Sequence, residues 1–190
     1  MDFQNTINLR HSVRSFEPKK VPKTILKSLI KNATKAPSSG NDQNWKFYVV
    51  SETNTRNKLA KLLSKSLNKF KGEFDKLSPK LQKITNEFYS DLGGCQNIIF
   101  AYIPKRLNFR DSAIASISCA CQNLMLSATN KELGTCWVGT FKGFEKEINK
   151  LLEIPKNEEL VASILIGYPS KDFKPLKRMK KKISDVLTFI

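Results

Sequence analysis

Residues 111–130 read DSAIASISCACQNLMLSATN and form the longest helical pattern in the chain. Small and apolar side chains recur on most of its turns, namely Ala113, Ile114, Ile117, Cys121, Leu124, Met125 and Ala128. Such a broad apolar stripe is wider than the stripe of an ordinary surface helix. We therefore expect this helix either at the centre of the core or at a subunit interface.

Strand patterns lie on both sides of this helix. Asn97–Ile103 and Leu160–Ile166 are short, nearly continuous apolar runs, and Trp45–Val50 alternates with β-branched and aromatic residues. Cys136–Gly139 reads as a short strand and loop, and Val186–Ile190 could form one last strand.

Amphipathic helical patterns fill the intervals between the strands. They begin at Pro22, around Leu59 and at Ser78-Pro79, where serine suits an N-cap and proline the first helical position, and another covers Phe144–Leu152. Residues 64–80 are polar and give no clear pattern. Because helices and strands alternate without regular βαβ repetition, the fold class is predicted to be α+β.

Length and composition indicate a single globular domain. The chain has 190 residues, 40% of them hydrophobic, with no internal repeat and no linker, so one domain over residues 1–190 is expected. The longest apolar runs are too short to cross a bilayer. The N-terminus lacks a charged-then-apolar signal pattern, which predicts a cytoplasmic protein without a membrane partner.

The cysteines and the single histidine disfavour a metal site. None of Cys95, Cys119, Cys121 and Cys136 forms a CxxC pair, and His11 is the only histidine. Cys119 and Cys121 lie in the long apolar helix, where we expect both to be reduced packing residues.

The chain is strongly basic, with a net charge of +16 and a pI near 9.8. A basic surface attracts nucleic-acid phosphates. However, the charge comes mostly from lysines spread along helix faces, and no zinc finger, arginine-rich arm or aromatic RNA-binding signature is present. The composition therefore favours a solvated lysine-rich surface over a nucleic-acid partner.

Arg10-His11-Ser12-Val13-Arg14-Ser15-Phe16 is a candidate binding segment. In an extended chain, alternate residues share a face, so Arg10, Ser12 and Arg14 would present two guanidinium groups and a hydroxyl together. That face suits a phosphate or a carbonyl-rich ring. The alternative is an ordinary solvated strand with surface arginines.

Ala36-Pro37-Ser38-Ser39-Gly40-Asn41 is a second candidate, directly after a helical pattern. Its small side chains would let backbone groups approach a ligand, although a simple helix-terminal turn fits equally well. The sequence holds no evident nucleophile–base pair, carboxylate pair or GxGxxG fingerprint. An enzyme of this sequence would take its reactivity from a cofactor.

These segments resemble the motifs of the nitroreductase family of FMN-dependent flavoproteins. The resemblance rests on five segments in order: Arg10–Phe16, Ala36–Asn41 with Gln43 and Trp45, Gln122–Ala128, Leu133–Gly139, and Gly167-Tyr168-Pro169 with the basic tail. Asn44 stands where the family usually has proline. Residues 64–95 match weakly, in the region where family members differ in substrate selection.

The resemblance implies a central, mostly antiparallel sheet flanked by helices, in an intertwined homodimer with C-terminal strand exchange. It also implies one FMN per subunit at the interface. The residues that it places at the flavin are Arg10 and Ser12 (phosphate and ribityl end), His11 (mainly its backbone), Arg14 (pyrimidine edge), Val138 and Gly139 (with the Gly139 amide near the hydride-accepting nitrogen), Arg178 and Lys180 (additional positive charge), and Pro37, Ser38, Ser39 and Asn41 (toward the partner's flavin).

The implied activity is electron transfer from NADH or NADPH through FMN to a nitroaromatic, quinone or related small-molecule acceptor. No side-chain acid or base is expected to take part. Two alternatives stay open: a flavin-binding or nucleic-acid-associated protein without turnover, and a family member with other flavin chemistry, such as dehalogenation or flavin breakdown. The choice between NADH and NADPH, the acceptor, and one- or two-electron transfer are also open.

Overall fold

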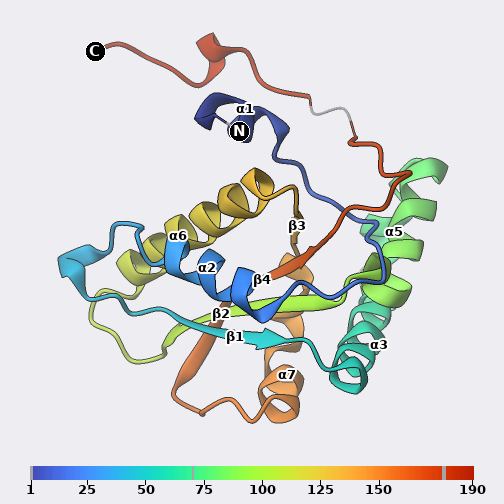
Figure 1. Ribbon diagram of the computed structural model, residues 1–190, viewed down its shortest axis with the longest axis horizontal. Helices are drawn as coiled ribbons and strands as arrows, with labels where there is room; N and C mark the ends of the chain where they lie inside the picture. The colour runs from blue at the N-terminus through green and yellow to red at the C-terminus, as the bar shows by residue number, and fades with distance from the viewer. Residues whose placement is uncertain (1, 70, 177–178) are drawn as a thin grey trace.

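The computed structural model describes residues 2–69, 71–176 and 179–190 (Figure 1). The helices are α1 (Phe3–Leu9), α2 (Lys23–Ala33), α3 (Thr53–Lys69), α4 (Lys71–Phe74), α5 (Pro79–Asp91), α6 (Arg110–Asn130) and α7 (Glu145–Leu151). The strands are β1 (Lys46–Val50), β2 (Asn97–Pro104), β3 (Gly134–Trp137) and β4 (Glu158–Gly167). The described residues also form four 3₁₀ turns: η1 (Ser39–Asn41), η2 (Leu92–Gly94), η3 (Gly139–Phe144) and η4 (Ile183–Asp185).

The four strands form one sheet in the order β1-β2-β4-β3. Every neighbouring pair is antiparallel, with Ile99 of β2 opposite Ile164 of β4 at the centre. Both central strands are almost completely buried, which explains their nearly unbroken apolar sequences. The predicted α+β class with an antiparallel sheet flanked by helices is confirmed.

Side chains of alternate residues on β2 enter two separate cores, one on each face of the sheet. Ile99 and Ala101 pack with α2 and α6, whereas Ile98 and Phe100 pack with α3, α5, η3 and α7. This division follows from the two-residue period of a strand. The long helix α6 therefore lies against the sheet on the same side as α2 (Figure 1).

The structure adds one helix to the elements expected from the sequence and corrects two expectations. Phe3–Leu9 forms a helix that the pattern did not predict. Cys121 is buried, but Cys119 is exposed, because positions two apart point to different sides of a helix. Val186–Ile190 forms no strand in the chain described and extends away from the sheet, with Phe189 89% exposed (Figure 1). A strand needs a partner strand, and exchange between two subunits stays a prediction.

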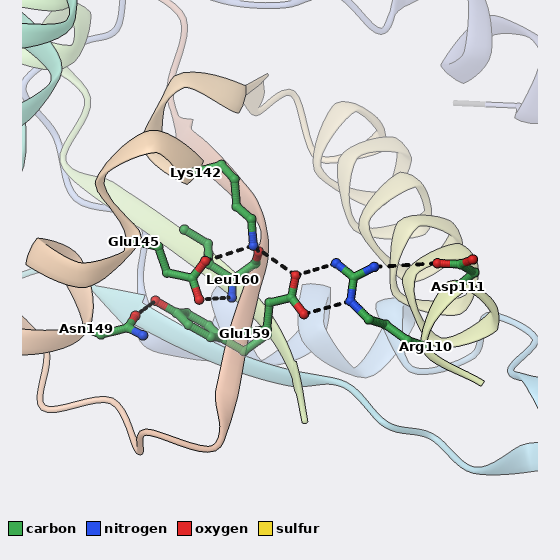
Figure 2. A network of polar contacts seen from close by, with 8 residues as sticks. Arg110, Asp111, Lys142, Glu145, Asn149, Glu159 and Leu160 are labelled. Carbon is green, nitrogen blue, oxygen red and sulfur yellow. Dashed lines mark hydrogen bonds and ion pairs between the residues drawn. The ribbon is translucent and has the colours of Figure 1, made fainter. Parts of the chain in front are cut away.

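A polar network ties the start of α6 to β4 and η3 (Figure 2). Glu159 accepts hydrogen bonds from Arg110 Nε at 2.9 Å and Arg110 Nη2 at 2.6 Å, and it also pairs with Lys142 Nζ at 3.1 Å. Lys142 Nζ pairs in turn with Glu145 at 2.8 Å. The hydrogen bonds from Arg110, followed by Lys142, lower the pKa of Glu159 to about 2.

Replacing this carboxylate, Glu159→Gln, is expected to reduce the free energy of unfolding by about 1 kcal/mol at neutral pH, the range for well-formed but partly exposed ion pairs. A lowered carboxyl pKa stabilises the fold above its ordinary value of 4.5 and loses that effect as the pH falls toward about 2. The difference between wild type and variant, measured by urea unfolding, should therefore shrink steadily below pH ~4.5. A difference that is constant with pH would contradict the ion-pair account.

Candidate functional site

The segment from Arg10 to Phe16 adds to the sheet edge beside β3. Arg10 ends α1 and the chain continues extended, with Ser12 in a bridge to Thr135 of β3. The Phe16 N–H then donates to the carbonyl of Gly93 in η2 at 2.8 Å. This places the segment between β3 and the end of α5.

The side chains of this segment follow the alternating pattern only in part, because Ser15 is exposed and Phe16 is buried. Val13 and Phe16 are buried in the core, whereas Arg10, Ser12 and Arg14 are half-buried at the surface of the protein. The Arg14 guanidinium also donates from Nη1 to the Ser12 carbonyl at 3.4 Å. The three polar side chains therefore stay together at one edge of the sheet.

Both arginines exert their charge on β3. Burial raises the pKa of the Cys136 thiol, and the positive charges of Arg14 and Arg10 act against that rise. The Ser12–Thr135 bridge and the hydrogen bond from the Val13 N–H to the Thr135 carbonyl at 2.9 Å place the chain that carries both arginines along β3. Two cations thus converge beside β3, where an anionic ligand would be favoured.

The backbone of the loop after β3 is accessible to a ligand at Gly139. Val138 is buried and its N–H donates to the Ser163 carbonyl at 2.8 Å, which fixes the start of the loop. Gly139 is exposed, and a Cβ built on it would meet no atom within 4 Å. A planar ligand could therefore approach the Gly139 backbone closely.

A hollow of about 560 Å³ lies next to Arg14. One wall is the segment 12–16, the second is α5 through Ile84, Glu87, Ser90 and Asp91, and the third is the tail through Asp172–Leu176. The sequence patterns did not predict the second wall, because α5 belongs to the region 64–95 whose role could not be assigned. Its position makes α5 a candidate for contact with whatever enters the hollow.

The second predicted segment is a tightly held loop at a different place. The Ser39 N–H donates to Ser116 Oγ of α6 at 3.2 Å, and the Gln43 N–H donates to Ser38 Oγ at 3.2 Å. Asn41 and Gln43 adopt left-handed backbone conformations with φ of 57° and 49°. Such conformations in non-glycine residues are costly and are concentrated at functional sites.

This loop borders a hollow of about 280 Å³. Ser38 and Ser39 line one side, and Leu107 and Phe109, just before α6, line the other. Phe109 is 73% exposed although it is aromatic. The sequence analysis did not single out the segment 107–109, and only this exposed phenylalanine at the start of α6 distinguishes it.

The two predicted halves of the site lie at opposite ends of α6 (Figure 1). The loop 38–41 contacts Ser116, whereas a small hollow beside His11 is lined by Thr129. From Ser116 to Thr129 a helix rises by about 20 Å. Of the remaining predicted residues, Pro37 is exposed beside the loop 38–41, and Lys180 is exposed in the tail. Arg178 lies outside the described residues. One chain therefore does not bring the two halves together.

The outer surface of α6 is unusual in this highly charged chain. Its exposed or half-buried positions include Ala115, Ser118, Cys119, Gln122 and Leu126, and no charged residue occurs between Asp111 and Lys131. Trp137 of the edge strand β3 is 37% exposed. An exposed face that lacks charge and carries small and apolar side chains is typical of a protein–protein interface.

Two further observations concern the described part of the chain. No helix there is long and apolar enough to span a membrane. No cluster of three or more histidine, cysteine or acidic side chains there is arranged to hold a metal ion.

The fold, the two arginines and the open glycine loop together define a class of protein. Comparison with known proteins identifies this class. The nitroreductase family matches residues 7–168, and the chain belongs to this family. The family predicted from the sequence motifs is therefore confirmed.

The names of individual relatives refer to different activities. The chain is 29% identical over 190 residues to the putative NAD(P)H nitroreductase YfhC of Bacillus subtilis, covering 97% of this chain and 92% of that protein. It is 26% identical over 201 residues to an iodotyrosine deiodinase of Danio rerio, covering 99% and 67%. The solved FMN-dependent nitroreductase NfnB from Mycobacterium smegmatis, in complex with NADPH, shares the fold with a TM-score of 0.79 at 20% identity, covering 98% and 97%.

Proposed function

We propose that the chain is an FMN-dependent oxidoreductase that takes electrons from NADH or NADPH and reduces a nitroaromatic, quinone or related acceptor. The observation that carries this proposal is the pairing of the Arg10–Arg14 segment with β3 through the Ser12–Thr135 bridge, on the strand that leads into the open backbone of Gly139. The membership of the nitroreductase family and the FMN-dependent structural neighbour support it.

The residues at the sheet edge fit FMN in charge and shape. Arg10 and Ser12 offer a cation and a hydroxyl for the phosphate and ribityl end, and the backbone of His11 lies between them. Lys180 and Arg178 of the tail would add charge. The open face of Gly139, after the buried Val138, has room for a flat ring. When bound, FMN supplies the hydride and electron chemistry that no side chain here can supply.

The contribution of the protein is positioning and electrostatics. With FMN bound at this edge of the sheet, the Arg14 guanidinium would stabilise the negative charge of the reduced flavin. Burial raises the pKa of the Cys136 thiol, which opposes formation of a nucleophilic thiolate. We therefore assign no side-chain acid or base to the reaction.

The active form is proposed to be a homodimer with two FMN sites at the interface. A second copy covering the uncharged face of α6 would bring its loop 37–41 to the arginines of the first copy. Pro37, Ser38, Ser39 and Asn41 would then contact the partner's flavin. The exposed apolar side chains of the tail, Ile183, Val186 and Phe189, are consistent with docking on a second subunit.

One preparation of the purified protein tests these points together. We expect flavin absorbance bands with about one FMN per chain, a dimeric mass by light scattering, and oxidation of NADH or NADPH coupled to reduction of a nitroaromatic. A colourless protein that does not take up added FMN would overturn the proposal. A monomer that binds FMN and turns over would overturn only the dimer.

Reductive dehalogenation is a second candidate, because relatives named iodotyrosine deiodinase match nearly the whole chain. The hollow walled by α5 lies next to Arg14, where an aromatic substrate could meet the flavin. Iodide release from iodotyrosine under reducing conditions, compared with nitroaromatic reduction by the same sample, separates the two activities.

Replacing Arg14 tests the chemistry separately from binding. Arg14→Gln keeps hydrogen-bond donors but loses the charge that stabilises reduced flavin, so the FMN reduction potential should fall by about 30 mV, equal to about 1.4 kcal/mol for a two-electron couple. FMN affinity should change less than the rate of flavin reduction. Lys61→Gln, which removes the charge of an exposed lysine of α3, is the matched control in the potentiometric titration. An unchanged potential in Arg14→Gln would remove Arg14 from the site.

A further inference from the structure

A cationic hollow of about 480 Å³ opens where β2 ends and β4 begins. The described residues that line it are Pro104, Lys105, Arg106, Lys156 and Asn157, which include three cations and no carboxylate. The Lys105 N–H donates to the Asn157 carbonyl at 2.8 Å, so the two segments are joined. The hollow is therefore a defined feature of the fold, with its positive charges on both sides.

The acidic residues at the start of β4 do not neutralise these cations. Glu158 is bound by Lys46 Nζ at 2.8 Å and by the Tyr48 hydroxyl at 2.6 Å. Glu159 is bound by Arg110 and Lys142 (Figure 2). Among the ion pairs of the described ranges, none involves Lys105, Arg106 or Lys156. The hollow thus retains its charge for an anion from solution.

This cationic hollow borders one half of the proposed flavin site. Arg106 is followed directly by Leu107, which together with Phe109 lines the hollow at the Ser38–Ser39 loop. Adjacent Cα atoms are about 3.8 Å apart. The two hollows are therefore joined through the Arg106–Leu107 peptide, with Lys156 also lining the cationic one.

We propose that Lys105, Arg106 and Lys156 bind the 2′-phosphate of NADPH while the nicotinamide end reaches the flavin. This inference rests on the proposed function, because it assigns the reductant of that reaction. NADH lacks the phosphate, and an arginine beside the adenosine ribose is a common means of accepting it. An arginine fork with two flanking lysines suits a phosphate monoester, since charge-assisted contacts to phosphate are strong and directional.

A binding measurement tests the phosphate site without turnover. Adenosine 2′-monophosphate, added to the FMN-loaded protein in a calorimeter, should bind more tightly than adenosine 5′-monophosphate or inorganic phosphate. The double variant Arg106→Ala/Lys156→Ala should weaken that binding by roughly tenfold or more, whereas Lys61→Ala, an exposed lysine of α3, should not. Equal binding of all three probes would overturn the proposal, because it would show a general anion patch.

A kinetic measurement separates this proposal from the proposed function. The wild type should have a lower KM for NADPH than for NADH, and the double variant should raise the KM for NADPH alone. Equal KM values in both proteins overturn the NADPH site and leave the oxidoreductase function intact. A protein that binds FMN but oxidises neither reductant overturns the proposed function, and with it the assignment of this hollow to the reductant.

Discussion

Replacing Arg10 with alanine is expected to weaken FMN binding by about 10- to 150-fold, because charge-assisted contacts to a phosphate are worth ~1.5–3 kcal/mol. Arg10 also ends α1, but it does so through its backbone N–H, which donates to the Thr6 carbonyl. The substitution therefore removes the guanidinium and keeps the helix end. Quenching of flavin fluorescence on titration of FMN into the apoprotein measures the change.

The interpretation depends on a control for general charge effects. Lys61→Ala removes one positive charge from α3, on the other side of the sheet from α6, and should leave FMN affinity unchanged. Far-ultraviolet circular dichroism of both variants checks that the fold is kept. If Arg10→Ala binds FMN as tightly as the wild type, Arg10 is an ordinary surface residue and the phosphate end of the proposed site must lie elsewhere.

The regular elements were predictable where the local sequence and the tertiary environment agree. Asn97–Ile103 is apolar at almost every position, and β2 is buried on both faces. Ser78 and Pro79 predicted a helix start, and the Ser78 hydroxyl does accept from the Leu81 N–H at 3.4 Å. In both places the local sequence preference and the tertiary packing favour the same structure.

Helix α1 shows why other elements escaped prediction. Its sequence FQNTINL has no continuous apolar stripe, and Thr6 is its only buried residue among those described. The helix is held by Asp2, whose side chain accepts from the Asn5 N–H at 2.9 Å, and by packing against α6. A short helix of this kind depends on its cap and its neighbours rather than on periodicity.

The site was predictable as a set of segments but not as an arrangement. The alternation in Arg10–Arg14 predicted side chains on one face, and in the structure Arg10, Ser12 and Arg14 are all half-buried on the segment that pairs with β3. Nothing in the local patterns indicated that the loop 38–41 would lie at the other end of α6. Distances between segments far apart in sequence are set by the packing of the whole chain, which a single sequence does not reveal.

Cavity walls were the least predictable part. The hollow beside Arg14 is completed by α5, and the cationic hollow joins residues 104–106 with 156–157. Each wall comes from segments that carry no motif of their own. Their roles follow only from their neighbours in space, as is common for residues that select substrates.

The second large effect is expected at Gly93, which holds the arginine segment in place. Gly93 has a left-handed φ of 60°, and a Cβ built there would overlap the Arg14 carbonyl oxygen and lie 3.2 Å from Phe88 Cδ2. Its own carbonyl accepts the Phe16 N–H. The segment 14–16 therefore packs directly on η2 at a position that only glycine fits.

Gly93→Ala should lower the free energy of unfolding by about 2–5 kcal/mol, the sum of a left-handed conformation in an L-residue and overpacking against a backbone that cannot yield. The alanine would push the Arg14 backbone away from η2, so FMN affinity should fall in the fraction that still folds. Gly72→Ala is the matched control: its Cβ meets no atom within 4 Å in α4, and its stability should stay the same or rise slightly. Urea unfolding of the three proteins and an FMN titration measure both effects. If Gly93→Ala is as stable as Gly72→Ala and binds FMN normally, the segment 12–16 is not held by η2, and the positioning of Arg14 must have another cause.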